Sequence, residues 1–283
     1  MPAVPVASVI FTTYNQPAWL EKTLLGFASQ DRTDFEVIVA DDGSGDDTRE
    51  LIESLRPRLP FELQHVWQPD EGFRKCQILN AAIRASRSDY VIVTDGDCIP
   101  RADFVSTHLA LRRPGSFLSG GYFKLPMHIS QAVSTDDIAS GRCFDLRWLR
   151  GQGLARKPRD IRLRVRGTAA KLLDGLSRAN PTWNGHNASG WKDDMVRVNG
   201  FDERMGYGGQ DREFGQRLRH AGIRPRRIRH RAITVHLDHP RGYADPVPRA
   251  VNERILDETA SHRAGWTEHG LRKGPRTTED THR

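Results

Sequence analysis

The chain has 283 residues, of which 37% are hydrophobic and 28% are charged, with a formal net charge of +7. This composition is typical of a soluble globular protein with a substantial core, in one large or two small domains. No stretch approaches the roughly 18 apolar residues of a membrane-spanning helix, and the N-terminus lacks the pattern of a signal peptide. We therefore expect a cytoplasmic protein. Three unevenly spaced cysteines fit free thiols better than disulfides or a zinc site: Cys76, Cys98 and Cys143.

Strand and helix patterns alternate through the first part of the chain. Runs of β-branched and aromatic residues predict buried strands at residues 8–13, 35–40 and 90–94. Amphipathic patterns predict helices that begin near Pro17, at Asp46 and after Arg74. Such alternation predicts an α/β fold, in which helices cover both faces of a mostly parallel sheet.

Polar residues follow each of the three predicted strands. They are Tyr14-Asn15, Asp41-Asp42 and Asp95-Gly96-Asp97. Because open α/β sheets bind ligands at the carboxyl ends of their strands, these residues predict one shared site. Carboxylate oxygens suit Mg²⁺ or Mn²⁺, which usually share their coordination with substrate phosphates. An isolated Asp-Gly-Asp would instead be an ordinary turn, but here it accompanies two other polar strand ends.

The segment from Gly141 to Arg178 is strongly basic. It holds eleven Lys and Arg against three Asp, a balance of +8, and interleaves them with apolar residues such as Trp148, Leu163 and Leu172. This pattern suits an anionic membrane surface or a phosphorylated lipid. A solvated insertion whose apolar face packs on the sheet fits equally well. No nucleic-acid motif accompanies the charge, so we expect no nucleic-acid partner.

Candidate site residues also lie in the second half. Residues 183–190 are too rich in Gly and Asn for regular structure and predict a loop that approaches a ligand with its backbone. Gly208 and Gly209 precede a predicted helix, whose dipole would keep Asp211 ionised in the first turn. Ordinary helix-start chemistry is the alternative for Asp211 and Glu213, and spacing alone favours it.

A predicted strand at 233–237 ends in a His-x-x-His pair. A lone histidine at a strand end is usually a surface residue or already hydrogen-bonded. Two of them, His236 and His239, in a chain that also holds Asp-Gly-Asp favour a metal ligand here.

In this order, the motifs TTYN, DDGS, GFRKCQILN, DGD, NGFDE and GYGGQD resemble the family 2 glycosyltransferases of GT-A fold. The second half is similar to the C-terminal module of β-1,4-galactosyltransferases and chondroitin-polymerase-type enzymes. The resemblance implies a single GT-A (Rossmann-like) domain at 1–240. Within it we expect a nucleotide-sugar half (1–125), a basic helical insertion (141–180) and an acceptor half (181–240). A partly disordered extension (241–283) would follow, with one helix near 252–261 and disorder in the last dozen residues.

The resemblance also implies roles for single residues. Nucleotide-sugar contacts would come from Thr12, Tyr14, Asp42, Arg74, Asp95 and Gly96, with Tyr14 stacking on the base, Asp42 accepting from the uracil imide and Arg74 reaching the diphosphate. The residues at the Mn²⁺ or Mg²⁺ site would be Asp97, His236 and Asp95, with Asp97 and His236 holding the metal itself and Asp95 holding the ribose or a metal-bound water. Asp211 would be the general base. The acceptor loop would include Asn187, Trp191, Gly209 and Gln210.

These roles imply a metal-dependent, inverting transfer from a UDP-sugar to a glycan or glycolipid, as in cell-surface polysaccharide or lipopolysaccharide synthesis. We expect the enzyme in the cytoplasm or at the inner face of the cytoplasmic membrane. Gln210 stands where related enzymes usually have Glu, so the acceptor cannot be carried over. A sugar nucleotidyltransferase is one alternative, although SVIFTTYNQP lacks its Gly-rich phosphate loop. A non-catalytic nucleotide-sugar or lipid-binding protein is the other.

Overall fold

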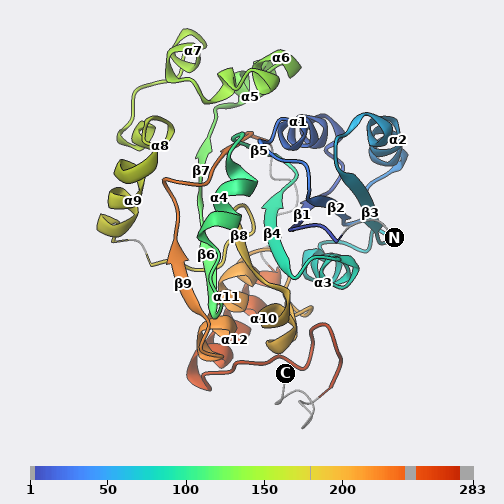
Figure 1. Ribbon diagram of the computed structural model, residues 1–283. Helices are drawn as coiled ribbons and strands as arrows, with labels where there is room; N and C mark the ends of the chain where they lie inside the picture. Colours follow the sequence, from blue (N-terminus) through green and yellow to red (C-terminus); the bar gives the residue numbers. More distant parts are fainter. Residues whose placement is uncertain (1–3, 179, 240–246, 275–283) are drawn as a thin grey trace.

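The computed structural model describes residues 4–178, 180–239 and 247–274. Its centre is a seven-stranded sheet in the order β3-β2-β1-β4-β8-β6-β9 (Figure 1). These strands are β3 (Glu62–Trp67), β2 (Glu36–Asp41), β1 (Ser8–Thr13), β4 (Tyr90–Asp95), β8 (Ala188–Trp191), β6 (Ser116–Ser119) and β9 (Arg224–Arg227). The first four in this order pair in parallel, whereas β8 is antiparallel to both of its neighbours. The predicted mostly parallel α/β sheet is confirmed.

Helices cover both faces of this sheet, because side chains of each strand alternate between two apolar cores. Val9 and Phe11 of β1 face one core and Ile10 faces the other. The Val9 side is covered by α1 (Pro17–Ala28), α2 (Asp46–Leu55) and α4 (Phe104–Leu111). The Ile10 side is covered by α3 (Lys75–Ala85), α10 (Lys192–Arg197), α11 (Gln210–His220) and α12 (Val247–Ser261). The helices predicted after Pro17, Asp46 and Arg74 are therefore present.

A second, three-stranded sheet has the order β5-β10-β7. It consists of β5 (Cys98–Pro100), β10 (Ile233–His236) and β7 (Gly121–Lys124). Its apolar side packs against α5 (Met127–Ala132), α6 (Thr135–Ala139), α7 (Leu146–Gly151) and α8 (Ile161–Arg164). Since His236 pairs with Cys98 across the antiparallel β5–β10 ladder, the sheet brings the strand-end histidine beside Asp97.

The basic segment is helical and only partly packed. Leu149, Leu154 and Leu163 are buried in the core of the small sheet, as the packed-insertion alternative predicts. Helix α9 (Gly167–Leu176) differs, because Leu172 and Leu176 are 63% and 68% exposed. In the described part of the chain, no helix is long and apolar enough to cross a membrane.

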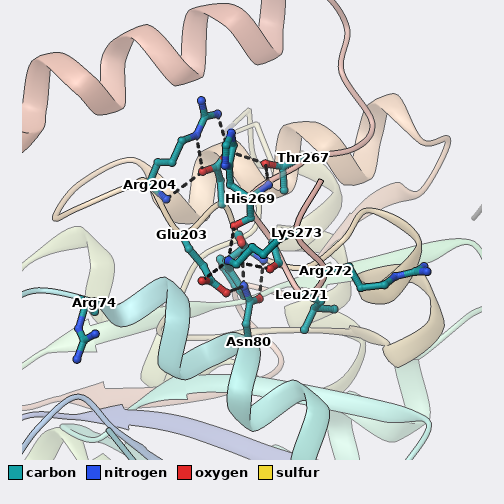
Figure 2. Close-up of polar contacts among 12 residues, drawn as sticks. Arg74, Asn80, Glu203, Arg204, Thr267, His269, Leu271, Arg272 and Lys273 are labelled. Carbon is teal, nitrogen blue, oxygen red and sulfur yellow. Dashed lines mark hydrogen bonds and ion pairs between the residues drawn. The ribbon is translucent and has the colours of Figure 1, made fainter. Parts of the chain in front are cut away.

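The end of the described chain packs on the domain. Helix α12 places Ile255 and Leu256 in the core that lies over α3 and α11, and it begins before the predicted position 252. Residues 267–273 then cross the loop that follows α10, where Thr267 Oγ1 donates to Asp202 at 2.6 Å and the Asn199 amide donates to two carbonyls of the crossing segment (Figure 2). The disorder predicted for the last dozen residues falls mostly on positions outside the described residues.

Short 3₁₀ turns complete the architecture. They span Arg56–Arg58, Arg142–Phe144 and Pro158–Asp160. Two of them lie in or beside the basic segment, where the chain turns repeatedly because Gly141 and Gly153 adopt positive φ.

Candidate active site

The carboxyl ends of β1, β2 and β4 meet the start of α11 and the end of β10 around one cavity of about 430 Å³. All of the predicted site residues line this cavity except Arg74, Asn187 and Trp191. The complete lining is Thr12, Thr13, Tyr14, Gln16, Asp42, Asp70, Gly72, Phe73, Lys75, Asp95, Gly96, Asp97, Tyr207, Gly208, Gly209, Gln210, Asp211, His236 and His239.

One end of the cavity presents Tyr14 and Asp42. Tyr14 is 39% exposed and donates its hydroxyl hydrogen to Asp70 at 2.9 Å, which raises the pKa of the phenol. Asp42 accepts from the backbone N–H of Arg74 at 2.9 Å and from the Gln68 amide. Burial raises the pKa of Asp42 although these donors oppose the shift. An exposed ring beside an anchored carboxylate can hold a flat heterocycle by stacking and one hydrogen bond.

The Asp-Gly-Asp turn is tied directly to the end of β1. The Gly96 N–H donates to the Thr12 carbonyl at 2.9 Å, and a Cβ at position 96 would lie only 2.8 Å from that oxygen. Thr23 Oγ1 donates to the Gly96 carbonyl at 2.9 Å. Glycine is therefore required for this close approach, which fixes Asp95 and Asp97 at the cavity wall.

Asp95 is paired with Lys75, a residue that sequence reasoning missed. Lys75 Nζ lies 2.6 Å from Asp95 Oδ1, and Thr12 Oγ1 donates to the same oxygen at 3.2 Å. Burial alone would raise the pKa of Asp95, but the charge and hydrogen bond of Lys75, together with the nearby His186 and His236, outweigh it and lower the pKa to about 2. The surrounding carboxylates raise the pKa of Lys75 despite its burial. A fixed cation thus sits among the carboxylates of the cavity.

Asp97 faces two histidines. His239 Nε2 lies 3.0 Å and His236 Nε2 lies 3.6 Å from Asp97 Oδ2. The Nδ1–H of His236 donates to the Leu237 carbonyl at 2.7 Å, which leaves Nε2 free to face Asp97 as an acceptor. Asp97, Cys98 and His236 also place ligand atoms within 4.8 Å of one another.

This donor set fits a divalent cation such as Mn²⁺. One carboxylate and two imidazole nitrogens converge on one point, and both ligand types suit Mn²⁺. Burial raises the pKa of the Cys98 thiol well above its usual value, and a soft sulfur ligand suits Mn²⁺ less than a carboxylate does. Asp95 is held by Lys75, whereas His239, absent from the predicted ligands, lies closer to Asp97 than His236 does. The His-x-x-His pattern in the sequence already pointed to His239 as a possible ligand.

Asp211 lies in the first turn of α11, on the cavity wall. A Cβ at Gly185 would lie 2.9 Å from Asp211 Oδ2, so the Gly- and Asn-rich loop approaches this carboxylate with its backbone. The expectation that residues 183–190 lack regular structure is wrong from Ala188 onward, because those residues form strand β8 between β4 and β6. Oδ1 is buried and has no hydrogen-bond partner among the described residues. Burial raises the pKa of Asp211, and the Lys75 charge opposes the shift only in part. The expectation that the helix dipole keeps Asp211 ionised stays a prediction. Such a carboxylate can accept a proton from a cavity ligand.

Glu213, the other acid in this turn, lies away from the cavity. Its carboxylate accepts from Arg217 Nε and Nη2 at 2.7 and 2.8 Å and from Thr259 Oγ1 at 3.0 Å. Both members of the Glu213–Arg217 pair are almost completely buried. Glu213 is therefore a structural residue that joins α11 to α12.

We expect Glu213→Ala to lower the free energy of unfolding by about 3–5 kcal/mol, because it leaves the Arg217 charge buried and unpaired. Urea unfolding measures this change. The control is Glu53→Ala, which removes an exposed pair with Arg56 and should leave the midpoint within experimental error. Equal midpoints for the two variants would contradict the structural role of Glu213.

Three predicted residues lie outside the cavity. The Arg74 guanidinium pairs with Glu71 at 2.8 Å and donates to the Pro69 carbonyl, and it lies apart from the other labelled side chains in Figure 2. The Asn187 amide is buried and donates to the carbonyls of Gly121 and Ala232. Trp191 pairs with Tyr90, at the opposite end of β4 from Asp95, because β8 runs antiparallel to β4.

Comparison with known families gives two matches. Residues 8–112 match the family described as "Glycosyl transferase family 2". Residues 176–240 match the family described as "N-terminal domain of galactosyltransferase". The two matches contain β1 to β4 with the Asp-Gly-Asp turn and the segment from β8 to β10, so together they carry the cavity lining.

Two curated relatives are similar over most of the chain. Validoxylamine A glucosyltransferase of Streptomyces hygroscopicus subsp. jinggangensis is 32% identical, over 78% of this chain and 53% of its own length. Chondroitin synthase of Escherichia coli is 28% identical, over 88% of this chain and 37% of its own length. The chain thus spans about half or less of these relatives.

Solved structures share the fold. A mannosyltransferase from Pyrobaculum calidifontis, in complex with GDP-Man and Mn²⁺, aligns with a TM-score of 0.60 at 21% identity, over 92% of this chain and 65% of its own. TarS 1–349 from S. aureus, in complex with UDP-GlcNAc, aligns with a TM-score of 0.61 at 16% identity, over 90% and 65%. From its family matches, its relatives and its GT-A fold, the chain belongs to the family 2 glycosyltransferases, with a galactosyltransferase-type module in its second half.

Proposed function

We propose that this protein is a metal-dependent, inverting glycosyltransferase that moves a sugar from a UDP-sugar to a hydroxyl of a glycan or glycolipid. One observation carries the proposal: Asp211, a carboxylate with one buried oxygen that has no hydrogen-bond partner among the described residues, shares a cavity with the metal-ligand set of Asp97, His236 and His239. Acceptors of the cell-surface polysaccharide or lipopolysaccharide type would fit the family, since one relative is named a chondroitin synthase.

The donor nucleotide would lie between Tyr14 and the strand ends. Tyr14 offers an exposed ring for the base, and Asp42 offers a carboxylate that the backbone of residue 74 holds in place. A uracil ring carries an imide N–H that can donate to such a carboxylate, which is why we propose UDP. The S. aureus neighbour is a complex with UDP-GlcNAc, whereas the P. calidifontis neighbour is a complex with GDP-Man.

The leaving diphosphate would be stabilised by positive charge. A divalent cation bound by Asp97, His236 and His239 would supply most of that charge. Lys75 would supply the rest in place of Arg74, because Lys75 lines the cavity and Arg74 pairs outside it. Asp95 keeps Lys75 fixed through their 2.6 Å contact. A positioned cation stabilises charge that develops in the transition state without moving during the reaction.

Asp211 would act as the general base. The acceptor oxygen forms a bond to the anomeric carbon of the sugar, the bond from that carbon to the diphosphate oxygen breaks, and UDP leaves with the electron pair. The hydroxyl proton passes to Asp211, whose raised pKa favours its uptake. A single displacement from the face opposite UDP inverts the configuration, so an α-linked donor would give a β-glycoside.

A screen of UDP-sugars and GDP-sugars, each with Mn²⁺ and with a chelator, tests this proposal by measuring release of the nucleoside diphosphate. We expect hydrolysis or transfer with at least one UDP-sugar, and loss of it with the chelator. Formation of a nucleotide-sugar from a nucleoside triphosphate would support a nucleotidyltransferase instead. Binding without turnover of any donor would support a non-catalytic protein.

We also propose that α9 and its flanking residues bind an anionic membrane surface. Leu172 and Leu176 are exposed one turn apart, and the neighbouring cations Arg164, Lys171 and Arg178 form no ion pair among the described residues. Exposed leucines beside basic side chains are typical of a helix that lies in a lipid interface.

Changing Arg164, Lys171 and Arg178 to Glu should weaken binding to anionic vesicles about tenfold or more, since each basic residue contributes about 1 kcal/mol. Added salt should weaken the wild type in the same way. Co-sedimentation with vesicles measures both effects, and UDP affinity should not change. Val251→Ser, at an exposed apolar residue on α12, is the control and should bind vesicles normally. If the amount of protein that sediments with vesicles changes neither with the charge reversal nor with added salt, a membrane role would be contradicted.

A further inference from the structure

The loop before Asp211 has an unusual backbone. Tyr207, Gly208 and Gly209 line the cavity, and the two glycines adopt φ of +100° and +90° in succession. Only glycine adopts this region freely, and the same freedom gives the loop many alternative conformations. Since Asp211 follows two residues later, its position depends on what holds this loop.

Asn252 of α12 holds the loop. It is 1% exposed, and its Nδ2 lies 3.1, 3.1 and 2.7 Å from the carbonyl oxygens of Gly206, Tyr207 and Gly208. Its Oδ1 accepts from the Gly206 N–H at 3.1 Å. One amide therefore contacts the backbone of three successive loop residues. The Gly208 N–H is taken by Gln210 Oε1 at 2.9 Å, so the loop is held from both sides.

Helix α12 is itself fixed at several points. Ile255 and Leu256 lie in the core, and Thr259 Oγ1 donates to Glu213 at 3.0 Å. A Cβ at Gly209 would lie 2.9 Å from Leu256 Cδ1, so the helix presses directly on the loop. Beyond the helix, residues 267–273 are tied to Asn199, Asp202 and Glu203 (Figure 2). Because α12 is held in place by these contacts, its side chains can hold the Gly206–Gly209 loop in one position.

We infer that Asn252 is a positioning residue for the transfer reaction, acting through the Gly206–Gly209 loop on Asp211. This rests on the proposed function, because it assumes that Asp211 accepts the proton. The chemistry of the side chain supports it: an amide supplies donors and an acceptor at once, as the carbonyls and the Gly206 N–H require. A carboxylate of the same shape has no hydrogen to donate and would face several carbonyl oxygens with a negative charge.

The experiment compares Asn252→Asp with Thr259→Val, a matched variant that removes a different buried hydrogen bond from the same helix. For Asn252→Asp we expect kcat for transfer to fall about 100-fold, because misplacement by about 1 Å costs that much. UDP affinity, which we assign to Tyr14, Asp42 and the metal ligands rather than to this loop, should stay within about threefold. Thr259→Val should lower the melting temperature but keep kcat at temperatures where it remains folded.

Hydrogen exchange of the amides of residues 206–211 gives a second readout that needs no substrate. These amides should exchange about tenfold or more faster in Asn252→Asp and at the wild-type rate in Thr259→Val. Unchanged exchange, or equal loss of kcat in both folded variants, would overturn the positioning role. If the wild type transfers no sugar at all, the proposed function fails, while the exchange result still decides whether Asn252 holds the loop.

Discussion

Replacing Asp211 by Asn should lower sugar transfer about 10²-fold or more, with donor binding intact. The Asn amide nearly preserves the shape of the carboxylate but cannot take up the proton of the attacking hydroxyl. Asp211 lies on the cavity wall with one buried oxygen unpaired among the described residues, and the amide oxygen of Asn can still accept from the Gly185 backbone as the carboxylate does. Initial rates at saturating donor, together with calorimetry of UDP with Mn²⁺, separate the chemical step from binding.

The control is Glu213→Gln, measured at a temperature where the variant remains folded. Glu213 pairs with Arg217 away from the cavity, so it should affect stability rather than the chemical step. Near-normal transfer by Asp211→Asn together with loss of transfer by Glu213→Gln would show that the wrong carboxylate has been chosen.

The pH dependence of kcat should also report the titration of Asp211 as the general base. Because burial raises the pKa of Asp211, its base form is lost as the pH falls through a value above the ordinary aspartate pKa of about 3.9. Asp95 has a pKa of about 2 and stays ionised in that range. The pKa of Asp42 is also raised, but we propose that Asp42 binds the donor, so its titration should be seen in KM. The acid limb of kcat should be absent in Asp211→Asn.

Much of the cavity could be predicted because parallel strands bring their carboxyl ends to the same edge. The polar residues after β1, β2 and β4 therefore converge, and the pairing of His236 with Cys98 completes the set. The fold class could be predicted from the alternation of strands and helices along the chain. Strands such as β1 and β4 are apolar on both faces, so helices must cover the sheet on both sides, as the two apolar cores show.

The remaining residues depend on geometry that spacing does not reveal. Helix α3 begins at Lys75, so one step along the chain decides that Lys75 enters the cavity and Arg74 does not. Trp191 lies at the far end of β4 because β8 runs antiparallel, and sequence alone did not give that direction. Asn252 lies more than forty positions from the loop it holds, within a tail that the sequence presents as polar and weakly periodic.

Asp97→Ala should abolish the metal dependence of donor binding and weaken UDP affinity in Mn²⁺ about 100-fold or more. Asp97 is the only carboxylate that faces both His236 and His239 among the described residues, so its loss leaves no carboxylate beside these two rings to hold a dication. Even residues that merely support metal ligands change affinity by about 10–100-fold, and a ligand itself should cost at least as much. Calorimetry of UDP with Mn²⁺ and with a chelator measures the difference.

Asp70→Asn is the matched control for this variant. Asp70 is also an acid of the cavity wall, but it accepts a hydrogen bond from Tyr14, where we propose that the nucleoside binds. It should therefore keep the response to Mn²⁺, whatever change it makes to UDP affinity. His239→Ala should lose as much metal response as His236→Ala, because the His239 ring is the closer of the two to Asp97. Equal UDP affinity of the wild type with and without the chelator would contradict a metal at this site. The leaving diphosphate would then depend on Lys75 alone for positive charge.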